Sequence, residues 1–420
     1  MKFSIKDFLF IVSLTLIFAQ YTRLVDFSYY TQFIIGLVWI LYDMVVICIQ
    51  KKKCRGDKEI AFFRKIFLIP WILIAIYSLF LYSIHQNENV KLNTYIAANG
   101  TILINTIFAF SALHIFRGKA LRNSLIALII VYILVTCNAI ISYGPNIIID
   151  KLREIFTTFD SKANPFEIGD CTFAAGLIFL IYLFYGKAKT KKEIKYLFVC
   201  GFFIILGLKR IQILSIVLVV LIGSFFKIVK KPRLHNILMN VCLLAIIMIA
   251  TFYLHLIVER LDEWTGLDMG RFNLYSFMAN YVDFTPSFLG HGYGFSNKFV
   301  ELNTNFSIIV LHNDIMRMYI ELGFCGFYIW LLYYLYLARK KIENKYGHFI
   351  SCQFFFMTMY LFVTYFTDNT INYFVTQYFY CLILPALLIG NSKYFPMKET
   401  ATTSREQNYN KDCTINKELQ

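Results

Sequence analysis

The sequence predicts an all-α, polytopic integral membrane protein with about twelve transmembrane helices. Of its 420 residues, 58% are hydrophobic, the mean hydropathy is +0.58, and apolar stretches long enough to cross about 30 Å of hydrocarbon recur along the chain. The formal net charge of +15 could suit a nucleic-acid partner, but in so apolar a chain it indicates cationic loops on one side of a bilayer. We therefore expect the lipid bilayer, and not nucleic acid, as a partner.

Twelve apolar segments account for the predicted helices. The first follows Lys2 and Lys6 as in a signal peptide, but no small-residue cleavage pattern comes after it, so we expect it to be retained. The cysteines show no metal-ligand spacing and mostly lie inside apolar runs, which predicts small core residues. The segments are 7–22, 29–49, 66–84, 94–116, 121–142, 168–186, 196–208, 211–229, 237–258, 314–337, 349–366 and 373–390.

The distribution of lysine and arginine predicts which side of the membrane each connection faces. Alternate connections and both termini hold 30 of the 41 cations, so both termini are expected in the cytoplasm. The same count divides 196–229 into a hairpin of two spans, because a single span would place the clusters at 187–195 and 230–233 on opposite sides.

The short first arm of this hairpin, 196–208, predicts an unusual depth for the two cations that follow it. A helix of this length extends only about 20 Å, so Lys209 and Arg210 are expected below the outer interface. Cations at that depth face a polar cavity or a partner, or else extend back to the interface.

The longest connection is expected on the outer face, and the candidate chemistry lies in it and just after it. Within it, 271–284 places apolar residues at helical spacing, which predicts an amphipathic helix lying on the membrane. The predicted organisation is nine helices over 1–258, a large extracytoplasmic loop over 259–312, three helices over 313–392 and a disordered cytoplasmic tail over 393–420.

A polar stripe follows this loop. In a helix from about Asn313, the side chains of Asn313, Arg317 and Glu321 fall on one face that runs from the outer interface into the bilayer. Such a stripe predicts a cleft filled by water or substrate, with Arg317 and Glu321 paired, and the alternative is a purely structural ion pair. His312, just outside the helix, can accept a proton from a hydroxyl near neutral pH.

Two arginines, Arg210 and Arg271, belong to the same outer region, where other cations are few. Fixed guanidinium groups suit bidentate hydrogen bonding to phosphate or diphosphate. A base beside them fits transfer from a phosphate-activated lipid better than ion transport. The sequence has no Walker A loop, HExxH or GxSxG motif, so we expect no metal or nucleotide cofactor at this site.

The run "GRFNLY … FLGHGYGFS … HNDIMRMYIELGFCGFYIW" resembles the signature region of the O-antigen polymerase and O-antigen ligase superfamily. That family also keeps an arginine, usually in Ser-Arg, at the outer start of an earlier helix, where this chain has Lys209-Arg210. The resemblance extends from 209 to 326, and the remaining helices match only in number and hydropathy. The matched positions are Arg210, Arg271, the turn 290–294, His312, Asn313, Glu321, Gly323 and Gly326.

The resemblance implies a GT-C-like, metal-independent glycosyltransferase of the bacterial cytoplasmic membrane that polymerises undecaprenyl-diphosphate-linked repeat units into O-antigen or capsule. It implies that His312 is the general base for the acceptor hydroxyl, or orients it, while Arg210 and Arg271 hold the diphosphate. Tyr293 would stack on a sugar ring or anchor at the interface. The residues implied around the substrate are Lys209, His291, Tyr293, Asn313, Arg317 and Glu321.

Three other functions remain open from the sequence. A ligase of the same superfamily would pass the glycan to a lipid or protein acceptor, and a flippase or transporter would move the lipid-linked oligosaccharide. A twelve-helix carrier usually has two related halves, and no such repeat is detected in this chain. A purely structural membrane subunit would leave the polar stripe hard to explain. For a polymerase, a chain-length regulator is a further candidate partner.

Overall fold

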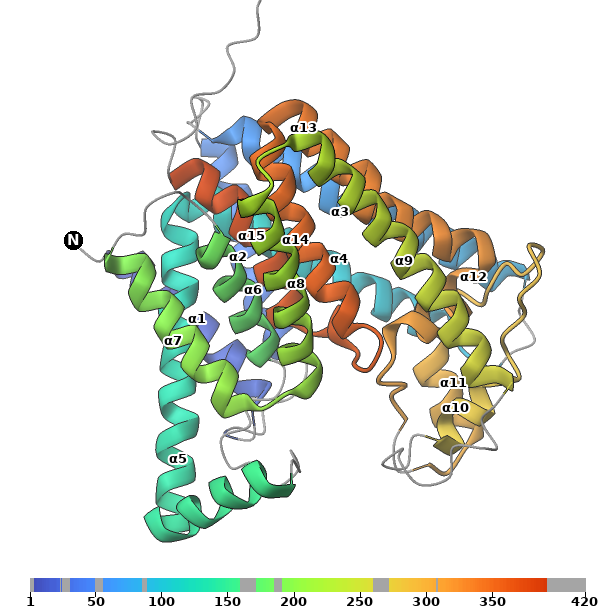
Figure 1. The fold of residues 1–420 in the computed structure, drawn as a ribbon, viewed down its shortest axis with the longest axis horizontal. Coiled ribbons are helices and arrows are strands. Elements are labelled where there is room, and N and C mark those ends of the chain that lie inside the picture. Colours follow the sequence, from blue (N-terminus) through green and yellow to red (C-terminus); the bar gives the residue numbers. More distant parts are fainter. Residues whose placement is uncertain are drawn as a thin grey trace, which may run out of the picture.

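The computed structural model consists of helices, with no strand among the residues that it describes (Figure 1). A helix occupies each of the twelve apolar segments, which confirms the all-α fold class. The predicted tail over 393–420 lies outside the described residues. The structure describes residues 4–22, 24, 31–49, 56–84, 89–158, 171–184, 191–259, 272–306 and 309–390.

The helices fall into two sets separated by the predicted outer loop. The first set is α1 (Ile5–Gln20), α2 (Thr31–Ile49), α3 (Asp57–Ile84), α4 (Leu92–Phe116), α5 (Lys119–Thr158), α6 (Cys171–Phe184), α7 (Lys191–Gly207), α8 (Arg210–Ile228) and α9 (Pro232–Glu259). The second set is α10 (Phe272–Ala279), α11 (Phe295–Asn303), α12 (Asp314–Leu332), a π-helical turn η3 (Tyr333–Ala338), α13 (Arg339–Tyr346), α14 (His348–Thr364), a 3₁₀ turn η4 (Thr370–Asn372) and α15 (Phe374–Gly390).

Among the described residues, seven helices are long and apolar enough to cross a membrane. Large apolar side chains on their outer faces are exposed, such as Leu221 on α8 and Met248 on α9, at 67% and 71%. Water would penalise such exposure, whereas lipid does not, so the chain is a polytopic membrane protein. The seven candidate spans are α2, α3, α4, the first part of α5, α8, α9 and the continuous run α12–η3–α13.

The predicted hairpin is present as two helices, α7 and α8, which run in opposite directions (Figure 1). Leu208, in the left-handed region at φ +48°, separates them, and Lys209 is the N-cap of α8. Lys209 is half-buried, and Arg210, the first residue of α8, is exposed.

Two connections differ from their sequence-based predictions. The helix expected over 121–142 continues as α5 to Thr158, with a kink at Gly144, where φ is +72°. The amphipathic helix expected over 271–284 is shorter: α10 ends at Ala279, and Tyr281 and Val282 donate to carbonyls three residues back instead of continuing the α-helical ladder. Only glycine readily adopts the kink conformation, so the α5 ladder breaks there and resumes in a new direction.

The centre of the molecule is formed by α6, α14 and α15, whose residues are buried along most of their length. α15 packs against α4, α5 and α6, and α14 packs against α6 and α8. At the other side, Figure 1 shows α10 and α11 gathered beside the ends of α9 and α12. This arrangement places the polar turn between α14 and α15 next to the start of α12.

A break inside α12 anchors the preceding loop. At Gly323 the backbone leaves the helical region, with φ +70° and ψ −177°. Because the break interrupts the ladder, the carbonyls of Ile320 and Glu321 are available and accept hydrogen bonds from the backbone N–H groups of His291 (3.0 Å) and Gly292 (2.8 Å). Backbone hydrogen bonds thereby join the loop to the helix.

Glycine is required on both sides of this junction. A Cβ on Gly290 would lie 2.3 Å from the amide nitrogen of Gly323, and a Cβ on Gly323 would lie 2.2 Å from the carbonyl carbon of Leu289. Backbone meets backbone at these points, so no flexible side chain can move aside. The close approach at Gly323 is therefore between α12 and the loop that precedes it.

We expect Gly323→Ala to destabilise the protein. The conformation at Gly323 is nearly exclusive to glycine, which costs about 1–3 kcal/mol for another residue before any clash is counted. The thermal unfolding midpoint in detergent and the monodisperse fraction after extraction would measure the loss. Gly100→Ala, in α4, is the matched control, because a Cβ there meets nothing within 4 Å and alanine favours helix. Equal stability of the two variants would contradict this role of Gly323.

Candidate functional site

His312 lies directly before the N-cap of α12 and faces a carboxylate. Its Nδ1 is 3.7 Å from Oδ1 of Asp368, which lies in the turn after α14. His312 is in the left-handed region at φ +45°, an uncommon conformation for a residue with a side chain. The imidazole is 31% exposed and the carboxylate 12% exposed, so a ligand can reach the ring while the carboxylate stays largely covered.

Asp368 is surrounded by groups that stabilise its ionised form. Burial raises the pKa of this carboxyl, but the nearby His312 imidazole, hydrogen bonds from Tyr373 and the backbone of Asn369, and the charge of Lys209 lower it by more, so the pKa lies below its usual 3.8. The Tyr373 hydroxyl donates at 2.5 Å and the Asn369 N–H at 2.9 Å. Asp368 is therefore an anion that can orient an imidazole and stabilise it when it is protonated.

The start of α12 is tied to the turn that carries Asp368. The Asn313 side chain caps the helix by accepting the Met316 N–H at 3.0 Å. The backbone N–H of Asp314 donates to the Asp368 carbonyl at 3.2 Å, and the Asp314 carboxylate accepts the Ile371 N–H at 2.8 Å. These bonds fix the position of His312 relative to Asp368.

Arg317, the cation of the polar stripe, is almost fully buried, with 2% of its surface exposed. Its Nη2 lies 2.8 Å from Oδ1 of Asp314, and its Nε lies 3.9 Å from Oε2 of Glu321. The predicted pair with Glu321 is thus the looser of two ion pairs, because Asp314 lies closer. Nε, Nη1 and Nη2 of Arg317 are buried and have no hydrogen-bond partner among the described residues, so the two carboxylates hold the guanidinium group by charge and its N–H donors are unsatisfied.

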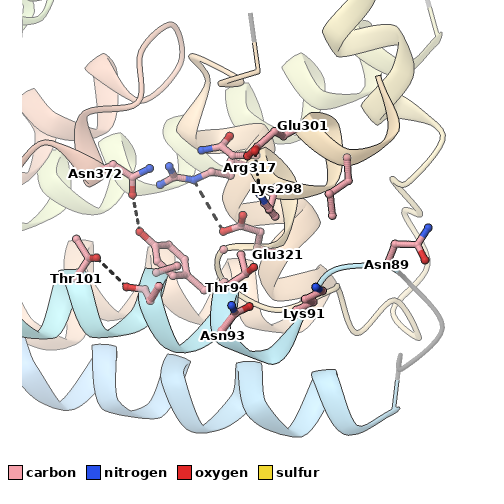
Figure 2. A pocket seen from close by; sticks show the side chains of 16 residues that line it. Asn89, Lys91, Asn93, Thr94, Thr101, Lys298, Glu301, Arg317, Glu321 and Asn372 are labelled. Carbon is pink, nitrogen blue, oxygen red and sulfur yellow. Dashed lines mark hydrogen bonds and ion pairs between the residues drawn. The ribbon is translucent and has the colours of Figure 1, made fainter. Parts of the chain in front are cut away.

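A cavity of about 610 Å³ opens beside Arg317 and Glu321 (Figure 2). Tyr293 lies under the guanidinium group, whose central carbon is 5.5 Å from the ring centroid, and its hydroxyl donates to Asn372 Oδ1 at 2.7 Å. The lining mixes amides, hydroxyls and both signs of charge, which suits a neutral, hydroxyl-rich ligand better than a bare anion. The polar lining residues are Asn89, Lys91, Asn93, Thr94, Thr101, Tyr293, Asn297, Lys298, Glu301, Arg317, Glu321 and Asn372.

The turn 290–294 brings Tyr293 into this cavity. Its backbone N–H donates to the Ser78 hydroxyl of α3 at 2.9 Å, and its carbonyl accepts from the Asn99 amide of α4 at 3.2 Å. Gly294, at φ +101°, packs so closely on α4 that a Cβ would lie 2.5 Å from that of Ala98. The turn therefore sits between α3 and α4 and directs the tyrosine ring inward.

The structure brings the sequence-predicted residues into two neighbouring groups. In the first group, Lys209 and His312 lie near Asp368 and lower the pKa of its carboxyl. In the second group, Tyr293, Arg317 and Glu321 line the cavity. Asn313 is the helix cap between them, and the His291 ring stacks on Phe295 at 4.5 Å. Arg210 lies beside Lys209 and is exposed. Arg271 lies outside the described residues.

Sequence reasoning missed the turn after α14, which contributes to both groups. Asp368 faces His312, Tyr373 donates a hydrogen bond to Asp368, and Asn372 borders the cavity. The available signal was the polar run Thr367-Asp368-Asn369-Thr370 between two apolar segments. It reads as an ordinary loop, because only the packing of α14 against its neighbours places it beside α12.

Replacing Asp368 with asparagine should lower the thermal unfolding midpoint of the purified protein in a pH-dependent way. Since the folded-state pKa of Asp368 is below 3.8, its stabilisation is complete above the unfolded-state pKa and disappears as the pH falls through the folded-state value. The difference between wild type and Asp368→Asn should persist from about pH 7 to about pH 5 and shrink below about pH 4.

Asp150→Asn, at an exposed carboxylate of α5, is the matched control and should leave the midpoint unchanged across this range. A difference between wild type and Asp368→Asn that stays constant down to about pH 3 would mean that the charge of Asp368 is not what stabilises the turn.

Comparison of the sequence with protein-family models and with curated proteins found no match.

Proposed function

We propose that this protein is a membrane glycosyltransferase that polymerises undecaprenyl-diphosphate-linked repeat units into a surface polysaccharide, at the outer face of a bacterial cytoplasmic membrane. The observation that carries the proposal is His312, held against the anionic Asp368 within reach of the charge of Lys209. A base, an orienting carboxylate and a cation are what transfer from a phosphate-activated sugar requires.

The proposed orientation has twelve spans, both termini in the cytoplasm and 259–312 outside. The shorter apolar helices α1, α6, α7, α14 and α15, of 14 to 17 residues, complete the count. In this orientation the cationic ends at 227–233 and 339–345 face the cytoplasm, and His312 with the cavity faces outward. A donor whose lipid tail lies in the outer leaflet can then present its diphosphate to Lys209 and Arg210.

In the proposed reaction His312 removes the proton from the acceptor hydroxyl. Because Nδ1 faces Asp368, Nε2 is the nitrogen that takes the proton, and Asp368 stabilises the imidazolium that forms. The acceptor oxygen forms a bond to the anomeric carbon of the donor, and the bond from that carbon to the diphosphate breaks. The electron pair leaves with the lipid diphosphate, whose charge Lys209, Arg210 and Arg271 neutralise.

The cavity beside Arg317 is the proposed site for sugar residues of the acceptor. Its volume of about 610 Å³ is within the range of small-ligand pockets. Amides and hydroxyls can exchange hydrogen bonds with sugar hydroxyls. The turn after α14 joins this cavity to His312, since Asn372 borders the cavity and Asp368 faces the histidine.

We expect His312→Ala and Arg271→Ala to abolish polymer while protein level is maintained and single lipid-linked repeats accumulate. Loss of a general base costs about 10²–10⁴-fold in rate. The measurement is the length distribution of the surface polysaccharide in cells that lack the native gene and carry each variant. In a reconstituted assay, a single lipid-linked repeat as both donor and acceptor should yield a ladder with the wild type, whereas a ligase would yield none.

His255→Ala is the matched control, because this histidine lies at the end of α9, stacks on Phe284 and is 41% exposed. It should keep a normal ladder. Normal polymer lengths in His312→Ala would remove the proposed base and with it this mechanism.

Filling the cavity should block the acceptor without touching His312. Ala97 lines the cavity, so Ala97→Trp is expected to suppress chain growth and leave single repeats. Ile96, the next residue of α4, is 57% exposed, and Ile96→Trp is the matched control that should polymerise normally. Equal polymer lengths in the two variants would exclude the cavity as the acceptor site.

A further inference from the structure

Three side chains with metal-binding atoms meet far from His312, between the start of α9 and the start of α14. They are His235, His348 and Cys352, and their ligand atoms all lie within 4.8 Å of one another. Nδ1 of His235 is 3.0 Å from Nε2 of His348, which is 3.4 Å from the Cys352 sulfur. His235 and Cys352 are buried, and the His348 side chain is 22% exposed.

The outer hydrogen bonds of the two imidazoles orient both rings toward a common point. Nε2 of His235 contacts the carbonyl oxygen of Val229, and Nδ1 of His348 lies 3.0 Å from a carboxylate oxygen of Glu343. Each of these oxygens can only accept, so the proton of each neutral ring is on its outer nitrogen. A carbonyl and a carboxylate behind two histidines is the usual support for histidines that bind a metal ion.

This proton arrangement leaves two lone pairs facing each other across 3.0 Å, from Nδ1 of His235 and Nε2 of His348. Two acceptors at that distance repel unless a positive charge lies between them, which is either a shared proton or a metal ion. The sulfur of Cys352 beside the same point favours a metal ion, because a thiolate is a strong ligand and a weak hydrogen-bond acceptor.

The spacing of the three atoms agrees with a tetrahedral zinc site. Bonds of about 2.0–2.1 Å to nitrogen and about 2.3 Å to sulfur place two nitrogens about 3.3 Å apart and a nitrogen and a sulfur about 3.6 Å apart. The two shorter separations, 3.0 and 3.4 Å, need only a few tenths of an ångström of movement, and the third pair lies within 4.8 Å. A side-chain rotation of Cys352 can close that gap.

We propose that His235, His348 and Cys352 bind one thiophilic divalent cation, Zn²⁺ being the best fit. The fourth position faces a cavity of about 360 Å³ walled by aromatic rings such as Phe226 and Phe356, where water can complete the coordination. Through His235, the ion fastens the start of α9 to the first two turns of α14.

The site is independent of the proposed glycosyl transfer. His348 begins α14, whereas Asp368 follows its end, so a 17-residue helix separates the two sites by about 25 Å. Lys227 borders the adjoining cavity and Lys340 pairs with Glu343. The metal site therefore lies among the cationic helix ends that face the cytoplasm in the orientation proposed above.

The test uses the full-length protein, purified in detergent without a histidine tag and dialysed against metal-free buffer. Titration with Co²⁺ should give one equivalent bound per chain, with a thiolate-to-cobalt charge-transfer band and visible bands of tetrahedral strength, and Zn²⁺ should displace it. Cys352→Ser and His235→Ala should abolish the charge-transfer band. Glu343→Gln should weaken Zn²⁺ binding about 10- to 100-fold, because it removes the support of His348.

Cys242→Ser is the matched control, since Cys242 lies on α9 with His235 but outside the cluster, and it should keep the band. Two results would overturn the proposal. One is wild-type protein that elutes as a folded monodisperse species yet binds no cobalt stoichiometrically, which would leave a shared proton between the histidines. The other is a charge-transfer band that survives Cys352→Ser, which would place the metal elsewhere.

Discussion

The break in α12 at Gly323 is the constraint on which the rest of the candidate site depends. It makes the carbonyls of Ile320 and Glu321 available for the loop that precedes α12, and that loop carries Tyr293. An unbroken helix would use those carbonyls internally and leave the loop without partners for its own backbone. In an apolar surrounding such unpaired groups are costly, so the break and the loop stabilise each other and hold the wall of the cavity.

Buried charge links the two groups of residues in the site. Asp314 contacts Arg317 through one carboxylate oxygen and the Ile371 N–H through the other. It therefore connects the wall of the cavity to the turn that carries Asp368. Two carboxylates share the guanidinium of Arg317, and burying such a cluster costs more than an apolar core of the same volume. A function for the stripe is the simplest reason for that cost, since α12 would pack without it.

Local patterns in the sequence were enough for the helices and for one half of the site. Twelve apolar runs correspond to helices, and the spacing of Arg317 and Glu321 on one helical face follows from 3.6 residues per turn. The rest of the site depends on contacts between residues that are far apart in the chain. Asp368 lies 56 residues beyond His312 in chain numbering, and His235 lies 113 residues before His348. His348 and Cys352 are four residues apart, which is visible in the sequence, but two ligands on one helix do not make a site without the third.

The sequence by itself determined the class of protein and the helical face on which the polar stripe lies, because hydropathy and helical periodicity act between neighbours along the chain. The tertiary structure decided which carboxylate faces His312, which partner Arg317 prefers and which histidine meets Cys352. Each of these depends on how helices distant in the chain pack, and that is set by the shapes of many side chains at once. A single spacing rule carries no information about such contacts.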